Sequence, residues 1–383
     1  MDFELSDEQI AYVDTARSFA ATELAPNAAH WDEEAIFPKD KLKAAGELGF
    51  MGMYTPEEAG GLGLPRLDSA MILEVLAAGC TSTAAFISIH NMALNMLARY
   101  GSDTVKSQWC EVLISGDKLA SYCLTEPGAG SDASSLKTRA EKVEGGYRLS
   151  GSKAFISGAG DTDVLVLMAR TGQDGPKGIS AFCVPADSDG ISYGKKESKM
   201  GWNSQPTRSI HFDQVFVPES ALLGAEGQGF AIAMEGLDGG RINIATCSVG
   251  AAQACLDHTL EYVAERRQFN QAIADFQATE FALADMQTEL VAARQMVRLA
   301  ASKLDGGAAD ASVYCAMAKR LATDLGFKVC NQALQLHGGY GYIREYPIER
   351  FVRDTRVHQI LEGTNEIMRV IVSRHLKHKG SVQ

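Results

Sequence analysis

The sequence predicts an α+β fold in three parts. These are an N-terminal α-helical domain over residues 1–118, a middle β-barrel or β-sandwich domain over 119–226, and a C-terminal four-helix bundle over 227–383. Three observations predict this order. Apolar residues recur at helical spacing in the first third, short apolar runs between turn residues fill the segment from about 121 to 218, and the helical period returns after Gly227. A chain of 383 residues is long enough for two or three domains.

Helices are expected first. Ser6 and Gln9 have the spacing of a capping box ahead of apolar residues at helical spacing, and Pro26 follows them. Glycine and proline then punctuate residues 49–65, and two further apolar helical stretches run near 68–80 and 83–100.

Short strands are expected next, each bounded by Gly, Asp or Pro. They cover residues 147–150, 164–168, 179–184 and 210–212. Together they predict an all-β insert of about 100 residues at typical strand and turn lengths.

Long amphipathic segments fill the last part of the chain, with short connections between them. They cover residues 241–264, 277–304, 309–335 and 364–379. Four such helices predict a bundle.

Composition restricts the partners. With 46% hydrophobic residues and a net charge of −12, the chain fits a globular protein; the charge argues against a surface for nucleic acid or anionic lipid but permits one local basic pocket for a phosphorylated cofactor. No apolar run approaches the roughly 20 residues of a membrane helix. The eight cysteines show neither C-x-x-C nor zinc-ligand spacing, so we expect no metal and a reducing compartment. Residues 1–5 run almost directly into a helix, which favours a bacterial cytoplasmic protein or, alternatively, a mature mitochondrial matrix form.

Two segments of the β domain are candidates for ligand contact. Residues 122–132 (YCLTEPGAGSD) form a glycine-containing loop with hydroxyls at Thr125 and Ser131, although a tight turn between domains explains it as well. In residues 153–160 (KAFISGAG), Phe155 could cover a flat ring and Ser157 could donate a hydrogen bond. The alternative for this segment is a strand with one buried phenylalanine.

Three segments of the helical part are further candidates. Asp238-Gly-Gly-Arg241, at an expected helix start, could present a guanidinium to a nucleotide, or simply carry a solvated arginine. Arg266 in the run RRQF could pair with a diphosphate, or belong to the charged surface. Residues 335–341 (QLHGGYG) could wrap a nucleotide, or only end a helix at glycine.

Glu362 is the candidate general base. It follows three mostly apolar residues and comes just before Thr364, which is a good N-cap for the last helix. A partly buried carboxylate has a raised pKa, which suits proton removal from a weak carbon acid. The alternative is a capping-region glutamate at the surface.

The order and spacing of these motifs together resemble the acyl-CoA dehydrogenase family. The likeness is carried by YCLTEPGAGSD, KAFISG, RRQF, QLHGGYGY and ILEGTNE, and it runs from about residue 5 to residue 376. The family's α–β–α fold agrees with the changes of periodicity described above.

The resemblance implies a non-covalently bound FAD. Residues matching family contacts to the flavin ring and the adjoining diphosphate are Tyr122, Cys123, Leu124, Thr125, Gly130, Ser131, Phe155, Ile156 and Ser157. Residues matching further FAD contacts, partly from a neighbouring subunit, are Arg266, Gln268, Phe269, Phe276, Gln335, Leu336, His337, Gly338 and Gly339, with Thr364, Asn365 and Glu366 near the adenosine end. Residues matching the CoA site are Ser131, Asp238, Gly239, Gly240 and Arg241.

The resemblance also implies the reaction and the partners. Glu362 would remove the α-proton of an acyl-CoA thioester while flavin N5 takes the β-hydrogen as hydride, and the backbone N–H of Glu362 would bind the thioester oxygen. Some family members carry the base just before the arginine of the DGGR segment, but Gly240 has no side chain and Glu235 lies on another helix face. Family members are mostly homotetramers and pass electrons to electron-transfer flavoprotein.

Several stretches resemble the branch of the family that acts on short branched acyl groups. They are residues 86–92, 200–208, 236–248 and 357–363. This likeness implies isobutyryl-CoA as substrate and methacrylyl-CoA as product, with butyryl-CoA and 2-methylbutyryl-CoA as alternatives. Residues near 86–95 and 234–241 are expected to form the acyl pocket.

Other functions on the same fold fit less well. An acyl-CoA oxidase usually has a much longer chain, and a nitroalkane oxidase would carry Asp at the position of Glu362. An acyl-CoA-binding protein without catalysis could have lost the base, which this chain retains. A DNA-binding relative would need a basic face, which the net charge of −12 does not support.

Overall fold

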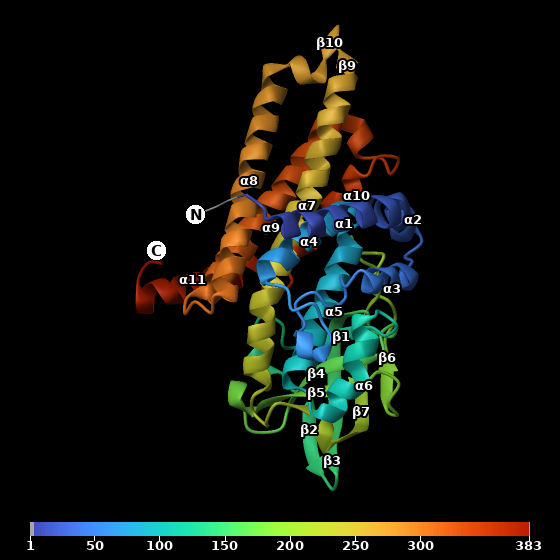
Figure 1. Cartoon of the computed structure of the whole chain (residues 1–383), viewed down its shortest axis with the longest axis vertical. Coiled ribbons are helices and arrows are strands. Elements are labelled where there is room, and N and C mark those ends of the chain that lie inside the picture. Colours follow the sequence, from blue (N-terminus) through green and yellow to red (C-terminus); the bar gives the residue numbers. More distant parts are fainter. Residues whose placement is uncertain (1–3, 383) are drawn as a thin grey trace.

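The computed structural model describes residues 4–382, so residues 1–3 and 383 of the predicted first and third domains lie outside the described residues. The molecule is elongated, with the β-sheet at one end and the C-terminal helices at the other (Figure 1). Helix α7 (Gly229–Glu265) runs from beside the sheet to the far end and connects both parts (Figure 1). The predicted α+β fold of helical, β and helical parts is confirmed. The predicted domain boundaries fall in the connections before β1 (Ala120–Cys123) and before α7.

The N-terminal part is entirely helical. Its helices are α1 (Asp7–Phe19), the π-helical η1 (Ala20–Leu24), α2 (Ala25–Glu33), α3 (Lys39–Glu47), the 3-10 helix η2 (Glu57–Ala59), α4 (Arg66–Gly79), α5 (Thr81–Tyr100) and α6 (Asp103–Ile114). The predicted capping box is confirmed, because the Ser6 hydroxyl accepts from the Gln9 N–H at 3.2 Å and the Gln9 side chain accepts from the Ser6 N–H at 3.1 Å. Two reciprocal hydrogen bonds therefore fix where α1 begins.

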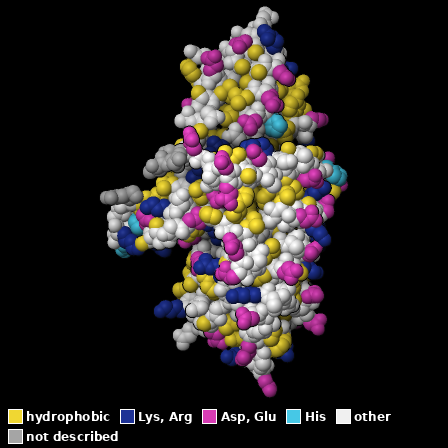
Figure 2. Space-filling view, viewed as in Figure 1, with side chains coloured by type: hydrophobic (Ala, Val, Ile, Leu, Met, Phe, Trp, Pro, Cys, Tyr) yellow, Lys and Arg dark blue, Asp and Glu magenta, His cyan; other side chains and the backbone are white. Residues whose placement is uncertain are grey.

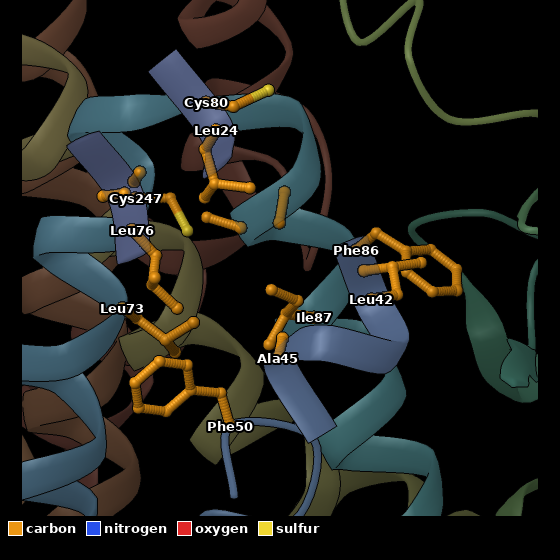
Figure 3. Close-up of a cluster of buried hydrophobic side chains, with 14 of the residues drawn as sticks. Leu24, Leu42, Ala45, Phe50, Leu73, Leu76, Cys80, Phe86, Ile87 and Cys247 are labelled. Atoms are coloured by element: carbon orange, nitrogen blue, oxygen red, sulfur yellow. The ribbon is translucent and has the colours of Figure 1, made fainter. Parts of the chain in front are cut away.

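A buried apolar cluster joins these helices to α7 (Figure 3). Leu24, Leu42, Leu73 and Leu76 are fully buried in it, and Cys247 reaches it from α7. Burying a leucine side chain stabilises a fold by roughly 1.5–3 kcal/mol. The N-terminal helices and α7 therefore share one core, which holds α5 firmly beside α7.

The strands of the middle part form one eight-stranded sheet. Its strands are β1, β2 (Arg139–Val143), β3 (Gly146–Ser157), β4 (Val164–Arg170), β5 (Ile179–Pro185), β6 (Ile191–Tyr193), β7 (Thr207–Pro218) and β8 (Leu222–Leu223). The strand order is β6-β7-β3-β2-β4-β5-β8, and β1 pairs with β4 in parallel. All residues of β4 are buried, because helices and strands cover both of its faces.

The C-terminal part contains the bundle. Its helices after α7 are α8 (Gln277–Asp305), α9 (Ala311–His337), α10 (Ile348–Arg356) and α11 (Asn365–Lys379), and the short strands β9 (Arg267–Gln268) and β10 (Gln271–Ala272) form a hairpin. Short 3-10 helices are η3 (Ala133–Ser135), η4 (Pro176–Gly178), η5 (Glu219–Ala221), η6 (Ile273–Asp275), η7 (Gly338–Gly341) and η8 (Val357–Gln359). Across residues 4–382, none of the helices combines the length and the apolar character needed to cross a membrane.

The start of the first bundle helix was predicted wrongly. Helix α7 begins at Gly229, so the segment from Asp238 to Arg241 lies inside the helix and not at its start. Glycine is a poor helix former, which is why Gly239 and Gly240 suggested a boundary. Both glycines are buried in the structure, so tertiary packing outweighs their weak helix propensity.

Candidate active site

Glu362 lies at a sharp turn before the last helix. Its φ is 56° and that of Gly363 is 89°, so two successive residues adopt a left-handed conformation. Thr364 then caps α11, since its hydroxyl accepts from the Ile367 N–H at 3.3 Å as predicted. This turn directs the carboxyl group of Glu362 into the molecule, where Oε2 is inaccessible to solvent. A carboxyl group at the surface is therefore excluded for Glu362.

Two adjacent glycines of α7 make room for two side chains. A Cβ on Gly240 would stand 2.5 Å from Oε2 of Glu362 and 3.2 Å from the sulfur of Met92 on α5. A Cβ on Gly239 would stand 2.6 Å from Nη1 of Arg66, whose guanidinium carbon lies 3.4 Å from the centre of the Tyr54 ring. The double glycine is thus needed for the approach of a carboxylate and a guanidinium.

The environment of Glu362 favours a base that works near neutral pH. Burial raises the pKa of Glu362 to about 7, although the neighbouring Arg241 and Lys319 act to lower it. Its Oε2 has no hydrogen-bond partner among the described residues, and the same holds for the hydroxyl of Tyr122. Burial and, second, the carboxylate of Glu362 hold the pKa of Tyr122 well above its usual value. Two buried polar atoms in this region therefore remain available to a ligand.

Arg241 is held in place by its own helix. Its Nη1 donates to Oδ1 of Asp238 at 2.5 Å, and the hydroxyl of Ser312 on α9 donates to the same oxygen at 2.9 Å. The residue is only 5% exposed, which excludes the solvated arginine considered above. Its buried Nε lacks an acceptor within residues 4–382 and can donate to a bound molecule.

The β domain exposes the aromatic ring of Phe155 to solvent. A β-bulge in the pairing of β3 with β7 falls between Lys153 and Ile156, and Phe155 takes a φ of 56° there. Phe155 is 67% exposed while Ala154 and Ile156 beside it are buried. A strand with one buried phenylalanine is therefore wrong for this segment.

The loop after β1 is shaped by a buried ion pair. Lys153 donates to the carbonyl oxygen of Leu124 at 3.0 Å and to Oε1 of Glu126 at 2.8 Å. The carboxylate of Glu126 also accepts from the N–H groups of Lys137 and Thr138. These contacts fix the conformation of the glycine-containing loop.

A second group of predicted cofactor residues lines a cavity of about 440 Å³ at the end of the bundle. The cavity residues are Tyr262, Arg266, Gln268, Ile273, Gln335, Leu336, His337, Gly338, Gly339, Tyr340 and Ile343. Phe269, 88% exposed, lies near Phe276 with 6.3 Å between the ring centres. Helix α9 ends at His337 and Gly338 has a φ of 59°, as the glycine stop predicted.

The residues present fit a flavin nucleotide. Phe155 offers an exposed aromatic ring, the hydroxyl of Tyr122 has no partner among the described residues, and Arg266 offers a cation in the cavity. A Cβ built on Gly338 or Gly339 meets no atom within 4 Å, so their backbone is open to a ligand. However, β9 and β10 lie at one end of the molecule, while β1 lies near its middle and β2 and β3 lie towards the other end (Figure 1). One chain therefore does not bring the two groups together.

Three residues around Glu362 were not predicted. Arg66 and Tyr54 have no sequence signal that distinguishes them from other arginines and tyrosines. Lys319 has one, because it interrupts an apolar helical stripe that includes Cys315 and Ala322. Met92 lies within the range expected for the acyl pocket and contacts the site.

Models of three acyl-CoA dehydrogenase domains match the chain in order. The N-terminal domain model matches residues 6–117, the middle domain model residues 121–215 and the C-terminal domain model residues 227–377. These matches cover most of the chain.

Full-length proteins are also similar. The mitochondrial isobutyryl-CoA dehydrogenases of Bos taurus and Dictyostelium discoideum are each 52% identical, over 97% of this chain and 89% and 90% of theirs. The structure of butyryl-CoA dehydrogenase from Megasphaera elsdenii superposes with a TM-score of 0.95 at 38% identity, covering 99% of this chain and 100% of that one. A structure described as PigA with FAD and proline superposes with a TM-score of 0.95 at 32% identity, covering 99% and 100%.

Proposed function

Because the chain belongs to the acyl-CoA dehydrogenase family and is thus an FAD-dependent oxidoreductase, we propose that it dehydrogenates isobutyryl-CoA to methacrylyl-CoA. The 52% identity to two isobutyryl-CoA dehydrogenases over nearly the whole chain supports this substrate. A role in valine breakdown follows from it.

Glu362 is the proposed base. The α-hydrogen of a thioester is a very weak acid, so its removal needs a carboxylate with a raised pKa and a donor for the thioester oxygen. The single observation that carries this role is the buried, unpaired Oε2 of Glu362 against the bare backbone of Gly240. The N–H of Glu362 at the same turn would donate to the thioester oxygen.

FAD would be held by two sets of residues, one in the β domain and one at the end of the helical bundle. The loop from Tyr122 to Ser131 and the bulge from Phe155 to Ser157 would contact its ring, while Arg266 and residues 335–339 would contact its diphosphate and adenosine. Thr364, Asn365 and Glu366 are proposed near the adenosine end. When bound, FAD supplies the redox chemistry by accepting the β-hydrogen with its electron pair. Asp238 and Arg241 would hold the CoA portion, for which Nε of Arg241 is available.

A homotetramer is the proposed assembly, with electron-transfer flavoprotein as the electron acceptor. Strands β9 and β10 lie at one end of the molecule, whereas β1, which carries Tyr122, lies near its middle, so a neighbouring subunit would complete each site (Figure 1). Hydrophobic atoms gather over the bundle end of the molecule (Figure 2). Exposed apolar residues of this part are Leu260, Phe269, Phe281, Val291, Leu299, Tyr340, Tyr342 and Ile343. Sedimentation of the FAD-loaded protein tests the assembly.

The substrate is tested by anaerobic titration of the flavin absorbance with isobutyryl-CoA and butyryl-CoA. Fast bleaching by isobutyryl-CoA and weak bleaching by butyryl-CoA are expected. Faster bleaching by butyryl-CoA would instead favour the second candidate, a straight-chain enzyme, which the likeness to butyryl-CoA dehydrogenase keeps open. Absence of any bleaching by either ester would contradict the dehydrogenase activity for short acyl groups.

A further inference from the structure

Lys319 is a buried cation with an unusual set of partners. It lies on α9, has no solvent exposure, and donates to the carbonyl oxygen of Gly363 at 2.7 Å and to Oδ1 of Asn365 at 3.0 Å. Lys153, which is equally buried, has a carboxylate partner in Glu126. The hydrogen bonds of Lys319 go to neutral oxygens instead. Since burying an ammonium is costly, its position needs a reason.

The contacts of Lys319 converge on the turn that carries Glu362. Gly363 and Glu362 are the two residues with left-handed backbone there, a conformation that glutamate seldom adopts. Asn365 is held in turn by the hydroxyl of Thr323 at 2.9 Å and by Oδ1 of Asp324 at 2.7 Å, both on α9. Helix α9 therefore holds the turn by hydrogen bonds, while the carboxylate of Glu362 lies against Gly240 on α7.

We propose that Lys319 is a positioning residue of the dehydrogenation: its hydrogen bonds to Gly363 and Asn365 fix the turn that carries Glu362, and its positive charge acts on the Glu362 carboxylate. This inference rests on the proposed role of Glu362 as the base. Lys319 acts through Glu362 and is not placed against the substrate.

The charges of Lys319 and Glu362 influence each other's pKa. The charge of Glu362 interacts with those of Arg241 on α7 and Lys319 on α9, and it raises the pKa of Tyr122 and, less strongly, of Tyr54. Burial lowers the pKa of Lys319 to about 7, and the carboxylate of Glu362 is the largest influence that raises it.

Other charged groups contribute less to the pKa of Lys319, whereas Arg241 lowers the pKa of Glu362 more than Lys319 does. Asp324 and Glu366 also raise the pKa of Lys319, Arg241 lowers it, and Lys319 itself lowers the pKa of the buried His358. Arg241 already pairs with Asp238. Without Lys319, the carboxylate of Glu362 would face only a cation that has its own partner, so its pKa would rise further.

Two substitutions separate the hydrogen bond from the charge. Lys319→Gln keeps an N–H donor for Gly363 but removes the charge, and Lys319→Met removes both. In the FAD-loaded enzyme, both variants should move the acid limb of the kcat/KM profile to higher pH by about one pH unit or more. Only Lys319→Met should also lower kcat on the alkaline plateau, by roughly 10- to 100-fold, because the turn loses its anchor.

A second readout does not depend on turnover. The infrared carbonyl band of protonated Glu362, identified by its loss in Glu362→Gln, should persist to higher pH in both Lys319 variants. If Lys319→Met fails to fold, the infrared band in Lys319→Gln still tests whether the charge of Lys319 lowers the pKa of Glu362. Val329→Ala, a buried change on the same helix, is the matched control and should lower the Tm without moving either profile.

The outcomes distinguish the two proposals. If the Lys319 variants have the wild-type pH profile and infrared band while Glu362→Gln is inactive, the role of Lys319 is wrong and Glu362 stays the proposed base. If Glu362→Gln retains the wild-type rate, the proposed base itself is wrong.

Discussion

The carboxylate of Glu362 occupies the space that a side chain at position 240 would take, since a Cβ on Gly240 would stand 2.5 Å from Oε2. A bare backbone therefore forms one wall beside the proposed base. The left-handed turn at Glu362 and the glycine inside α7 are complementary: each is unfavourable locally, and each is explained by the other.

Gly240→Ala should lower activity without unfolding the protein. Alanine favours a helix by about 1 kcal/mol over glycine, but its Cβ would displace the carboxylate of Glu362 or the sulfur of Met92. We expect kcat to fall roughly 10- to 100-fold while the Tm changes little. Gly239→Ala is the comparison, because it displaces the flexible end of Arg66 instead and should reduce kcat less. Equal effects of both changes would contradict this account.

Glu362→Gln should abolish proton removal and keep the shape of the site. Loss of a general base costs about 10²- to 10⁴-fold in rate, and we expect flavin bleaching by isobutyryl-CoA to slow by at least that much. Isothermal titration should show that acyl-CoA binding survives. Glu144→Gln, in the exposed hairpin turn between β2 and β3, removes a charge far from the site and should leave the bleaching rate as it is. Fast bleaching in Glu362→Gln would assign the base elsewhere.

The sequence predicts local features of this fold well. The capping box at Ser6, the cap at Thr364 and the glycine stop after His337 depend on neighbours within a few residues, and all three are confirmed. The strands at β3, β4, β5 and β7 are confirmed for the same reason, because turn residues bound each apolar run.

Features that depend on distant partners could not be predicted in this way. Helix α7 continues through Gly239 and Gly240, which are buried and leave room for Arg66 and Glu362 from distant parts of the chain. The exposure of Phe155 follows from a bulge in the pairing with β7, which no residue near Phe155 specifies. The family resemblance pointed to most of the proposed site residues, but it gave no reason to single out Lys319.

The pH dependence of the wild-type enzyme should show one limb near pH 7. Burial raises the pKa of Glu362 to about 7, and only the ionised carboxylate accepts a proton. Thus kcat/KM should fall about tenfold for each pH unit below this value and level off above it. Stopped-flow bleaching at low substrate concentration measures this directly. A limb near pH 4.5 would show that the carboxylate is solvated in the working enzyme.

Asp354 should make stability depend on pH. It is buried, its Oδ1 accepts from the Trp202 N–H at 2.6 Å, and burial raises its pKa to about 7. A carboxyl group whose pKa is higher in the folded state stabilises the fold below its unfolded pKa of 3.8, and this contribution is lost as pH rises towards 7. Asp354→Asn keeps an oxygen that accepts from the Trp202 N–H but cannot ionise. The free energy of unfolding should therefore fall less between pH 5 and pH 8 in this variant than in the wild type, by on the order of a few kcal/mol. Denaturant titrations at both pH values check this, and an unchanged difference would contradict it.

Phe155→Ala should weaken FAD binding. Phe155 is 67% exposed, so its removal costs the folded chain little, but a bound flavin would lose an aromatic contact worth about 1.5 kcal/mol. The dissociation constant of FAD should therefore rise about tenfold, as measured by flavin fluorescence during reconstitution of the apoprotein. Phe216→Ala is the matched control, because Phe216 is 46% exposed on β7 of the same sheet and is not among the proposed cofactor contacts. If both variants bind FAD as the wild type does, the flavin ring does not rest on Phe155, and the bulge that exposes this side chain needs another explanation.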